Sequence, residues 1–189
     1  CFTAPCKGGC PIQQDIPEYI ELCRKGQYAS ALRLITEKNP LPFITGTICA
    51  HRCQTKCTRN YYDESVQIRA TKLVAAEKGY DAYMAKIKAP VPAGDGRKVA
   101  VIGGGPTGMS AAYFLGRAGI PVTIFEKADC LGGIVRQVIP SFRISDDAID
   151  NDVALMFKMG VQVRLNTPAP SVAELKAQGF THIFFAVGA

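Results

Sequence analysis

The sequence lacks several features that would point to other classes of protein. No stretch reaches the ~18 apolar residues of a membrane span, so we expect none. No signal-peptide pattern is present, and Lys and Arg are scattered rather than gathered on a basic helix, so we expect no nucleic-acid partner. No nucleophile–base or carboxylate pair suggests hydrolysis, so we predict no catalytic side chain. The chain begins with Cys rather than Met, and we expect it to be part of a longer protein.

Cysteine is present but unevenly distributed. Six of the eight cysteines fall into two groups, one in "CFTAPCKGGC" (Cys1, Cys6, Cys10) and one in "CAHRCQTKC" (Cys49, Cys53, Cys57). Small secreted scaffolds spread cysteines through a chain with little core, whereas this chain is 48% hydrophobic. The grouping favours a metal or iron–sulfur module in a reducing, cytoplasmic compartment.

The spacing of the thiols favours iron–sulfur clusters over zinc. Zinc ligands usually come in pairs two residues apart, and neither group contains such a pair. Cysteines four positions apart on a helix share one face. Cys10 precedes Pro11, and in bacterial ferredoxins the cysteine before proline ligates the second of two clusters. The alternative is a structural zinc/cysteine module that braces the rest of the chain and has no electron-transfer role.

The first part of the chain predicts a helical domain, residues 1–88. Apolar residues recur at helical spacing in residues 15–26, 28–39 and 65–87. We expect the last of these helices to break near Gly79, because glycine is a poor helix former.

The second part predicts a different fold. Residues 89–97 include "APVPAGDG", which is typical of a linker. From residue 98 to residue 189, short apolar strands alternate with helices, and Ser145 is a predicted N-cap. This alternation predicts a parallel sheet with helices on its faces.

A glycine-rich loop joins the first predicted strand to the first predicted helix of this second part. "VAVIGGGPTGMSAA" contains Gly103-x-Gly105-x-x-Gly108. These glycines allow a tight turn, close approach to a pyrophosphate and tight helix–strand packing. Glu126 ends the next strand, where an acid can bind ribose hydroxyls. The glycine spacing between a strand and a helix, together with an acid at the end of the next strand, predicts a dinucleotide-binding site.

The motifs in this order resemble one known family. They are "CFTAPCKGGCP", "NPLPFITGTICAHRCQTKC", "SVQIRATKLVAAEKG", "VAVIGGGPTG", "FEKADCLGG", "IPSFRIS" and "AVGA". Together they resemble the N-terminal iron–sulfur and FAD unit of the glutamate synthase small subunit, of dihydropyrimidine dehydrogenase and of NADH-dependent ferredoxin:NADP oxidoreductase. The sequences of these motifs are most similar to those of the iron–sulfur/FAD subunit associated with selenate reduction. The resemblance implies a helical iron–sulfur domain followed by the first part of a Rossmann-like FAD-binding domain.

The resemblance also implies two [4Fe-4S] clusters. One would take Cys1, Cys6 and Cys57, with a fourth cysteine that precedes the chain. The other would take the remaining three thiols of the two groups: Cys10, Cys49 and Cys53. Its fourth ligand in the family is a Gln or Glu at the position of Lys72, and lysine is a poor ligand at neutral pH. Asp63, Glu64 and Glu77 are candidate substitutes.

On the flavin side, the resemblance implies an FAD site built from the glycine loop and the segments that follow the second strand. The implied cofactor contacts are Ile48, Gly103, Gly104, Gly105, Pro106, Thr107, Gly108, Glu126, Lys127, Leu131, Gly132, Gly133, Ile134 and Arg143. FAD would accept hydride from NAD(P)H, held by a domain outside this chain. Electrons would then pass through the clusters to a partner subunit or domain.

Overall fold

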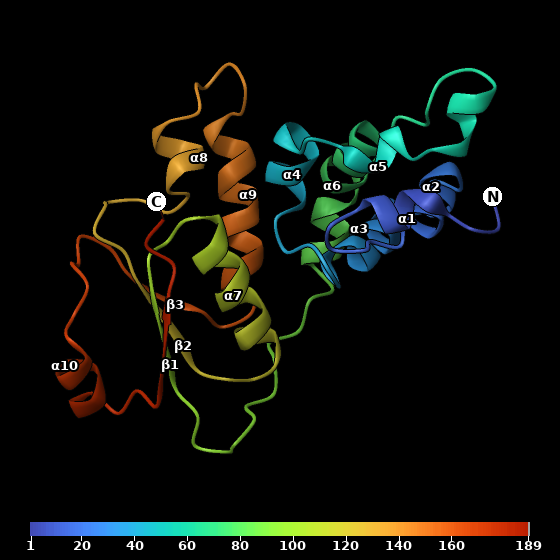
Figure 1. The fold of residues 1–189 in the computed structure, drawn as a ribbon. Coiled ribbons are helices and arrows are strands. Elements are labelled where there is room, and N and C mark those ends of the chain that lie inside the picture. The colour runs from blue at the N-terminus through green and yellow to red at the C-terminus, as the bar shows by residue number, and fades with distance from the viewer. Residues whose placement is uncertain (189) are drawn as a thin grey trace. The chain divides into compact units, whose positions relative to one another are not determined.

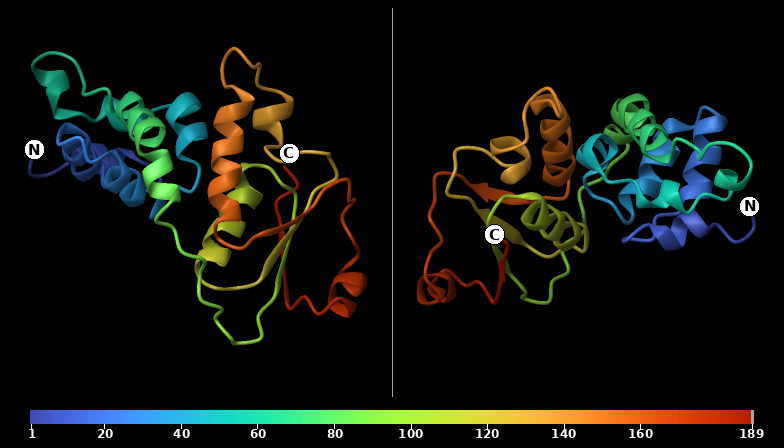
Figure 2. Two further views of the ribbon diagram at one scale, coloured as in Figure 1. Left: turned by 180° about the vertical axis from the view of Figure 1, so that it is seen from behind. Right: turned by 45° about the horizontal axis from the view of Figure 1, so that its top comes forward.

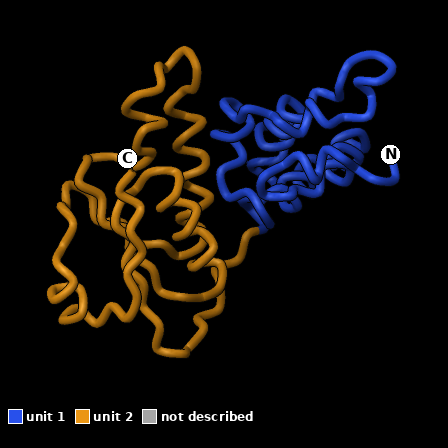
Figure 3. The backbone as a smooth tube through the Cα atoms, in the orientation of Figure 1, with its two compact units in different colours: residues 1–86 blue, residues 87–189 orange. Residues whose placement is uncertain are grey.

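The chain forms two compact units. The structure, a computed structural model, describes residues 1–188. One unit comprises residues 1–86 and the other residues 87–189 (Figure 3). Among the described residues, no helix is both long and apolar enough to cross a membrane. The predicted linker, residues 89–97, lies within a stretch that forms neither helix nor strand.

The first unit is entirely helical (Figure 1). Its elements are α1 (Pro5–Gly9), α2 (Ile16–Arg24), α3 (Tyr28–Thr36), α4 (Pro42–Ile48), α5 (Arg52–Thr55), a 3-10 turn (Thr58–Tyr61) and α6 (Ile68–Met84). Helices α1, α2 and α4 carry proline in the first turn, where the missing N–H costs no intrahelical hydrogen bond. The three long helices, α2, α3 and α6, match the predicted ones, and the short helices α1, α4 and α5 were not predicted.

The predicted break of the last helix near Gly79 is wrong. Helix α6 continues through Gly79 to Met84. A Cβ at Gly79 would lie 2.5 Å from the backbone oxygen of Tyr28, the first residue of α3. The glycine therefore lets two helices approach closely, and this packing outweighs the low helix propensity of glycine.

We expect Gly79→Ala to destabilise the first unit by about 2 kcal/mol, because the added methyl group overlaps backbone that cannot rotate away. Thermal unfolding followed by circular dichroism checks this. Gly8→Ala is the matched control, since a Cβ at Gly8 meets nothing within 4 Å. Equal melting temperatures for the two variants would contradict the close approach of α3 and α6.

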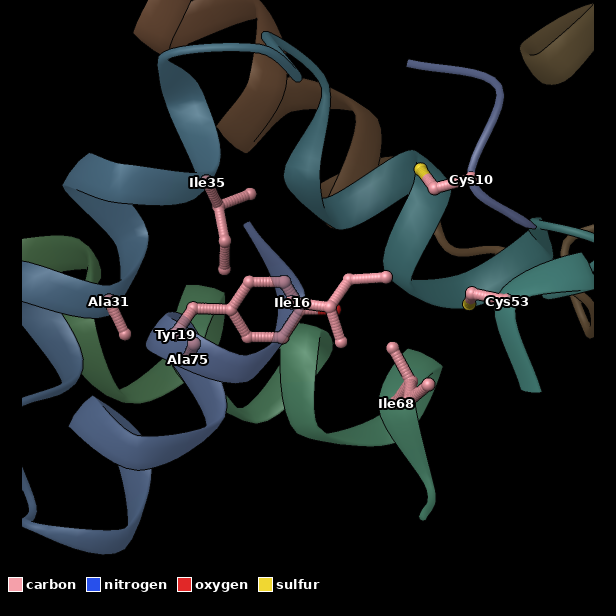
Figure 4. Close-up of a cluster of buried hydrophobic side chains, with 8 residues drawn as sticks. All are labelled: Cys10, Ile16, Tyr19, Ala31, Ile35, Cys53, Ile68 and Ala75. Atoms are coloured by element: carbon pink, nitrogen blue, oxygen red, sulfur yellow. The ribbon is translucent and has the colours of Figure 1, made fainter. Parts of the chain in front are cut away.

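A hydrophobic cluster in the first unit includes two of the grouped cysteines. Its buried members are Cys10, Ile16, Tyr19, Ala31, Ile35, Cys53, Ile68 and Ala75 (Figure 4). The two thiols lie at the edge of the cluster nearest Ile68, and they come from segments far apart in the sequence (Figure 4). The core of this unit therefore positions cysteines from both groups.

The second unit contains a four-stranded sheet with β1 (Val99–Ile102), β2 (Val122–Phe125), β3 (Gln162–Arg164) and β4 (His182–Phe185). The strand order is β3-β2-β1-β4, and every pair is parallel. The predicted parallel sheet is confirmed. The central strands β1 and β2 are buried at every residue, as expected for strands covered on both faces.

Helices cover the sheet from both sides (Figures 1 and 2). They are α7 (Pro106–Arg117), α9 (Asp146–Phe157) and α10 (Val172–Ala177), whereas the short α8 (Ile134–Gln137) lies beside α9, beyond the ends of the strands (Figure 1). On one face, Leu175 of α10 packs with Ala100, Ile102 and Phe125. Helices α7 and α9 lie together on the opposite side (Figure 2). The predicted cap of α9 is confirmed, since Ser145 Oγ accepts from the backbone N–H of Ala148 at 3.3 Å.

Candidate iron–sulfur and dinucleotide sites

The structure brings Cys1, Cys6 and Cys57 to one end of the first unit. Thr58 Oγ1, next to Cys57, donates to Cys1 Sγ at 3.6 Å. Burial raises the pKa of the Cys6 thiol, and the nearby Cys57 thiol raises it further. Helix α1, which carries Cys6, packs against α5, which carries Cys53, and Cys10 also raises the pKa of Cys6, so the two sets of thiols lie close to each other. Cys1, Cys6 and Cys57 are those that the family resemblance assigns to the first cluster.

The other three grouped cysteines line a small cavity. Cys10 from the first cysteine group and Cys49 and Cys53 from the second group border it. Burial raises the pKa of the Cys53 thiol, and Cys10 and Cys49 raise it further. This is the set that the resemblance assigns to the second cluster.

The spacing of the thiols bears on the zinc alternative. Within residues 1–188, no three His, Cys, Asp or Glu side chains are placed to share one metal ion. Thiolate ligands of zinc all lie about 2.3 Å from one ion. The cysteines of a [4Fe-4S] cluster bind different irons, and this requires wider spacing.

Cationic side chains border the second cavity. Arg52, Arg69 and Lys72 all line it. Arg69 Nη1 donates to the carbonyl oxygen of Cys49 at 3.1 Å. Lys72 is 4% exposed, and its charge favours the thiolate form of Cys53 by lowering its pKa. The positive lining suits a thiolate-bound cluster, whose potential depends on its net charge and on hydrogen bonds to its sulfurs.

Polar groups beside the cysteines also face the second cavity. The backbone N–H of His51 donates to Cys49 Sγ at 3.4 Å. Gln14 Oε1 and His51 Nδ1 are buried and have no hydrogen-bond partner among the described residues, and both residues line the cavity. The three thiols and three cations fit a bound anionic cluster. Buried polar atoms are normally satisfied, and the unpartnered Gln14 Oε1, which only accepts, calls for a donor or a metal beside it.

The acids considered as substitute ligands lie elsewhere. Asp63 forms an ion pair with Arg59 at the surface, and Glu64 and Glu77 are exposed. Only Lys72, of the positions considered from the sequence, borders the cavity. The three acids are near the cysteines in sequence, but closeness in sequence did not predict which side chains border the cavity. That depends on how α6 and the turn before it pack.

An ion-pair network holds the loop that joins Cys10 to α2. Asp15 pairs with Lys7 and with Lys38, the latter at 2.8 Å. The hydrogen bond from Lys38 and then that from Lys7 lower the pKa of Asp15. Lys38 Nζ also donates to the carbonyl oxygen of Gln13 at 2.9 Å. The loop beside the second cavity is therefore anchored to α1 and to the end of α3.

We expect Asp15→Asn to lower the stability of the protein at neutral pH by about 1 kcal/mol, the usual order for a partly exposed ion pair. Because the folded-state pKa of Asp15 is lowered, the carboxylate contributes fully above the unfolded pKa of about 4, and this contribution is lost as pH falls through the folded value. Melting temperatures of the wild type and the variant should therefore converge in acid. A difference that persists in acid would contradict this account.

In the second unit, the glycine loop has the conformation that its pattern predicts. Gly103 follows β1 with φ 108°, and a Cβ there would lie 2.3 Å from the oxygen of Ala186. A Cβ on Gly108 would lie 1.9 Å from the oxygen of Gly103. Gly105 is the N-cap of α7, and Pro106 is in its first turn. The backbone N–H groups at this helix start are available to bind a phosphate.

Glu126 connects the loop to the end of β2. It is 6% exposed, its Oε2 accepts from Gly104 N at 2.6 Å, and its Oε1 accepts from Ala128 N at 2.8 Å. The predicted ribose ligand therefore also fixes the glycine loop in place. The sequence pattern alone does not reveal this second role.

The later glycine pair lies against the first loop. Gly132 N donates to Gly104 O at 2.9 Å, and a Cβ on Gly133 would lie 2.8 Å from the Cα of Gly105. Leu131 packs close to Gly104, since a Cβ there would meet its side chain at 2.4 Å. Two glycine-rich segments from different parts of the sequence thus form one surface.

The remaining predicted contacts vary in exposure. Thr107, Lys127, Ile134 and Arg143 are exposed, and Gly108 is buried. In the first unit, Ile48 ends α4 directly before Cys49. Their roles toward a cofactor remain predictions from the resemblance.

Comparison with protein families matches both parts of the chain. Residues 1–83 match the family described as dihydropyrimidine dehydrogenase domain II, 4Fe-4S cluster. Residues 101–173 match the NAD(P)-binding Rossmann-like domain. The predicted order of an iron–sulfur domain followed by a Rossmann-like domain is confirmed.

Related proteins match the chain over its whole length. YgfK of Escherichia coli (strain K12), provisionally named an oxidoreductase, is 47% identical over all of this chain and 18% of its own length. The NADPH-Fe(3+) oxidoreductase subunit beta of Geobacter sulfurreducens (strain DL-1 / KN400) is 35% identical over all of this chain and 28% of its own. The glutamate synthase [NADPH] small chain of Mycobacterium tuberculosis (strain CDC 1551 / Oshkosh) is 32% identical over all of this chain and 39% of its own. The predicted resemblance is confirmed, and the chain spans less than half of each relative.

Among solved structures, a 2-naphthoyl-CoA reductase complex has a TM-score of 0.46 and 27% identity, covering 78% of this chain and 24% of that chain.

Proposed function

We propose that this chain is the electron-transfer part of an NAD(P)H-dependent iron–sulfur flavoprotein. The support is its similarity throughout to the glutamate synthase small chain and over residues 1–83 to dihydropyrimidine dehydrogenase domain II. When bound, FAD would exchange hydride with NAD(P)H, and two [4Fe-4S] clusters would carry single electrons to a partner subunit or domain. The cofactors supply the redox chemistry, and the protein binds and tunes them. On this proposal, none of residues 1–188 needs to act as a catalytic acid or base.

The observation that carries the proposal is the sorting of the six cysteines into two sets. Cys10, Cys49 and Cys53 share a cavity that Cys1, Cys6 and Cys57 do not line. Cys57 raises the pKa of the Cys6 thiol more than Cys10 does, and Thr58, next to Cys57, donates to Cys1. Two sets of thiols drawn from the same two sequence groups suit two separate clusters. Cationic and N–H groups around the second set would raise its reduction potential by stabilising negative charge.

The glycine surface supports a dinucleotide in the second unit. Gly103, Gly105 and the start of α7 would bind the pyrophosphate, and Glu126 would bind a ribose hydroxyl. We assign FAD rather than NAD(P) to this site because Gly132 and Gly133 resemble the second glycine motif of flavoproteins with two dinucleotide-binding domains. The pair lies directly against the first loop, as that assignment requires. The NAD(P)H site would belong to a further part of the protein.

Anaerobic reduction of the full-length protein tests this function. We expect bound FAD, iron and acid-labile sulfide, and we expect NADPH or NADH to bleach the flavin and then the cluster absorption. Flavin reduction without cluster reduction would contradict the electron-transfer role. Zinc in place of iron and sulfide would favour a structural module instead.

A further inference from the structure

The second cavity offers three thiols to a cluster that contains four irons. The polar side chains that border it besides the cysteines are Gln14, Tyr19, His51, Arg52, Arg69 and Lys72. Arginine and protonated lysine are donors only and have no lone pair for iron. Lys72 also has interactions of its own. Tyr19 belongs to the buried hydrophobic cluster, and a protonated phenol is a weak ligand for iron. The remaining candidates for the fourth position are therefore Gln14 and His51.

Gln14 is the more deeply buried of the two. It is 5% exposed, whereas His51 is half-buried. The Nε2 group of Gln14 donates to Cys10 Sγ at 3.9 Å, so the carboxamide lies beside a predicted cluster ligand. Its Oε1 is buried and has no hydrogen-bond partner among the described residues. An amide oxygen with free lone pairs beside three thiols can act as a neutral ligand.

The backbone before Gln14 adopts a conformation that directs this side chain inward. Gln13 has φ 47°, an uncommon value for a residue other than glycine. Gln13 N donates to Cys10 O at 2.9 Å, which closes a turn, and Lys38 Nζ binds the Gln13 carbonyl oxygen at 2.9 Å. Strained backbone of this kind is concentrated at functional sites. The turn fixes Gln14 at the cavity next to Cys10.

We propose that the carboxamide oxygen of Gln14 is the fourth ligand of the cluster held by Cys10, Cys49 and Cys53. This rests on the proposed function, because it requires a cluster in that cavity. A neutral oxygen ligand leaves the cluster less negative than a fourth thiolate would, and a less negative cluster is easier to reduce. The charge of Lys72, beside Cys53, acts in the same direction.

Iron quantification and EPR spectroscopy of the full-length protein test the ligand. We expect Gln14→Leu to lose one iron per chain and to show the EPR signal of an oxidised three-iron cluster. Gln14→Glu keeps an oxygen ligand, so it should retain the wild-type iron content and lower the midpoint potential of this cluster. Gln27→Leu is the control, since Gln27 lies in the same unit, is exposed and makes no side-chain capping hydrogen bond, and it should leave both readouts unchanged.

The outcomes separate this ligand from its competitors. A wild-type iron content in Gln14→Leu, with no three-iron signal, would overturn the proposal. A three-iron signal in His51→Ala or Lys72→Met but not in Gln14→Leu would overturn it in favour of the other residue. If Gln14→Leu folds poorly, retention of iron by Gln14→Glu and its loss in Gln14→Ala still decide the matter. Loss of no iron even in Cys53→Ala would instead refute the cluster in this cavity, and with it the proposed function.

Discussion

Cys53→Ala is expected to remove the second cluster and to lower the iron content of the full-length protein by about four atoms per chain. Cys53 is buried and lines the cavity. Burial raises the pKa of its thiol, and the nearby thiols of Cys10 and Cys49 raise it further. Its loss leaves two thiols and one amide, too few to hold four irons. Iron and sulfide analysis, with EPR of the reduced protein, measures the effect.

Cys23→Ala is the matched control for this variant. Cys23 packs against the same hydrophobic cluster as Cys53, and its pKa is raised by burial alone, with no neighbouring thiol contributing. Both variants remove a sulfur from the same core, so they share the cost of a small cavity. We expect the iron content of Cys23→Ala to equal that of the wild type. Equal iron loss in the two variants would show that packing, and not ligation, is responsible.

Gly108→Ala is expected to abolish FAD binding and to lower the stability of the second unit by about 3 kcal/mol. Its Cβ would lie 1.9 Å from the Gly103 oxygen and 3.2 Å from a methyl group of Val101. Since the nearest contact is backbone, no side-chain rotation relieves the overlap. The loop and the start of α7 must move, and the phosphate-binding N–H groups move with them. FAD content and thermal unfolding measure the two effects.

Gly105→Ala separates binding from folding in the same loop. A Cβ on Gly105 would meet only the Cα of Gly133, at 3.8 Å, which is an ordinary contact. The variant should therefore melt like the wild type. Its methyl group would stand where the pyrophosphate approaches the backbone, so we expect FAD affinity to fall by at least about tenfold, or 1.4 kcal/mol. Unchanged affinity in Gly105→Ala would place the pyrophosphate elsewhere.

The features that sequence predicted best are those that local chemistry determines. The cysteine groups and the glycine spacing require particular residue types at fixed offsets, whatever surrounds them. The parallel sheet followed from the alternation of strands with helices. Ser145 was predicted as an N-cap because its side chain acts on a neighbour three residues away.

The features that sequence missed depend on contacts between distant segments. Gly79 is tolerated in α6 because Tyr28 packs against it, and no local pattern shows this. Gln14 is buried because of the turn at Gln13, and its only sequence signal is a polar residue four positions after Cys10. Glu77 is exposed and Lys72 is buried because of the way α6 packs. Helical periodicity alone did not predict which face of α6 would be buried.

The partition of iron between the two cysteine sets is the most direct test of the account. Iron per chain should be measured in the full-length protein, in the triple variant Cys10→Ala/Cys49→Ala/Cys53→Ala and in the triple variant Cys1→Ala/Cys6→Ala/Cys57→Ala, with FAD content as the check on folding. The account predicts a loss of about four irons in each variant and about eight when all six cysteines are replaced. Loss of all the cluster iron in either triple variant alone, or no loss in one of them, would contradict two separate clusters.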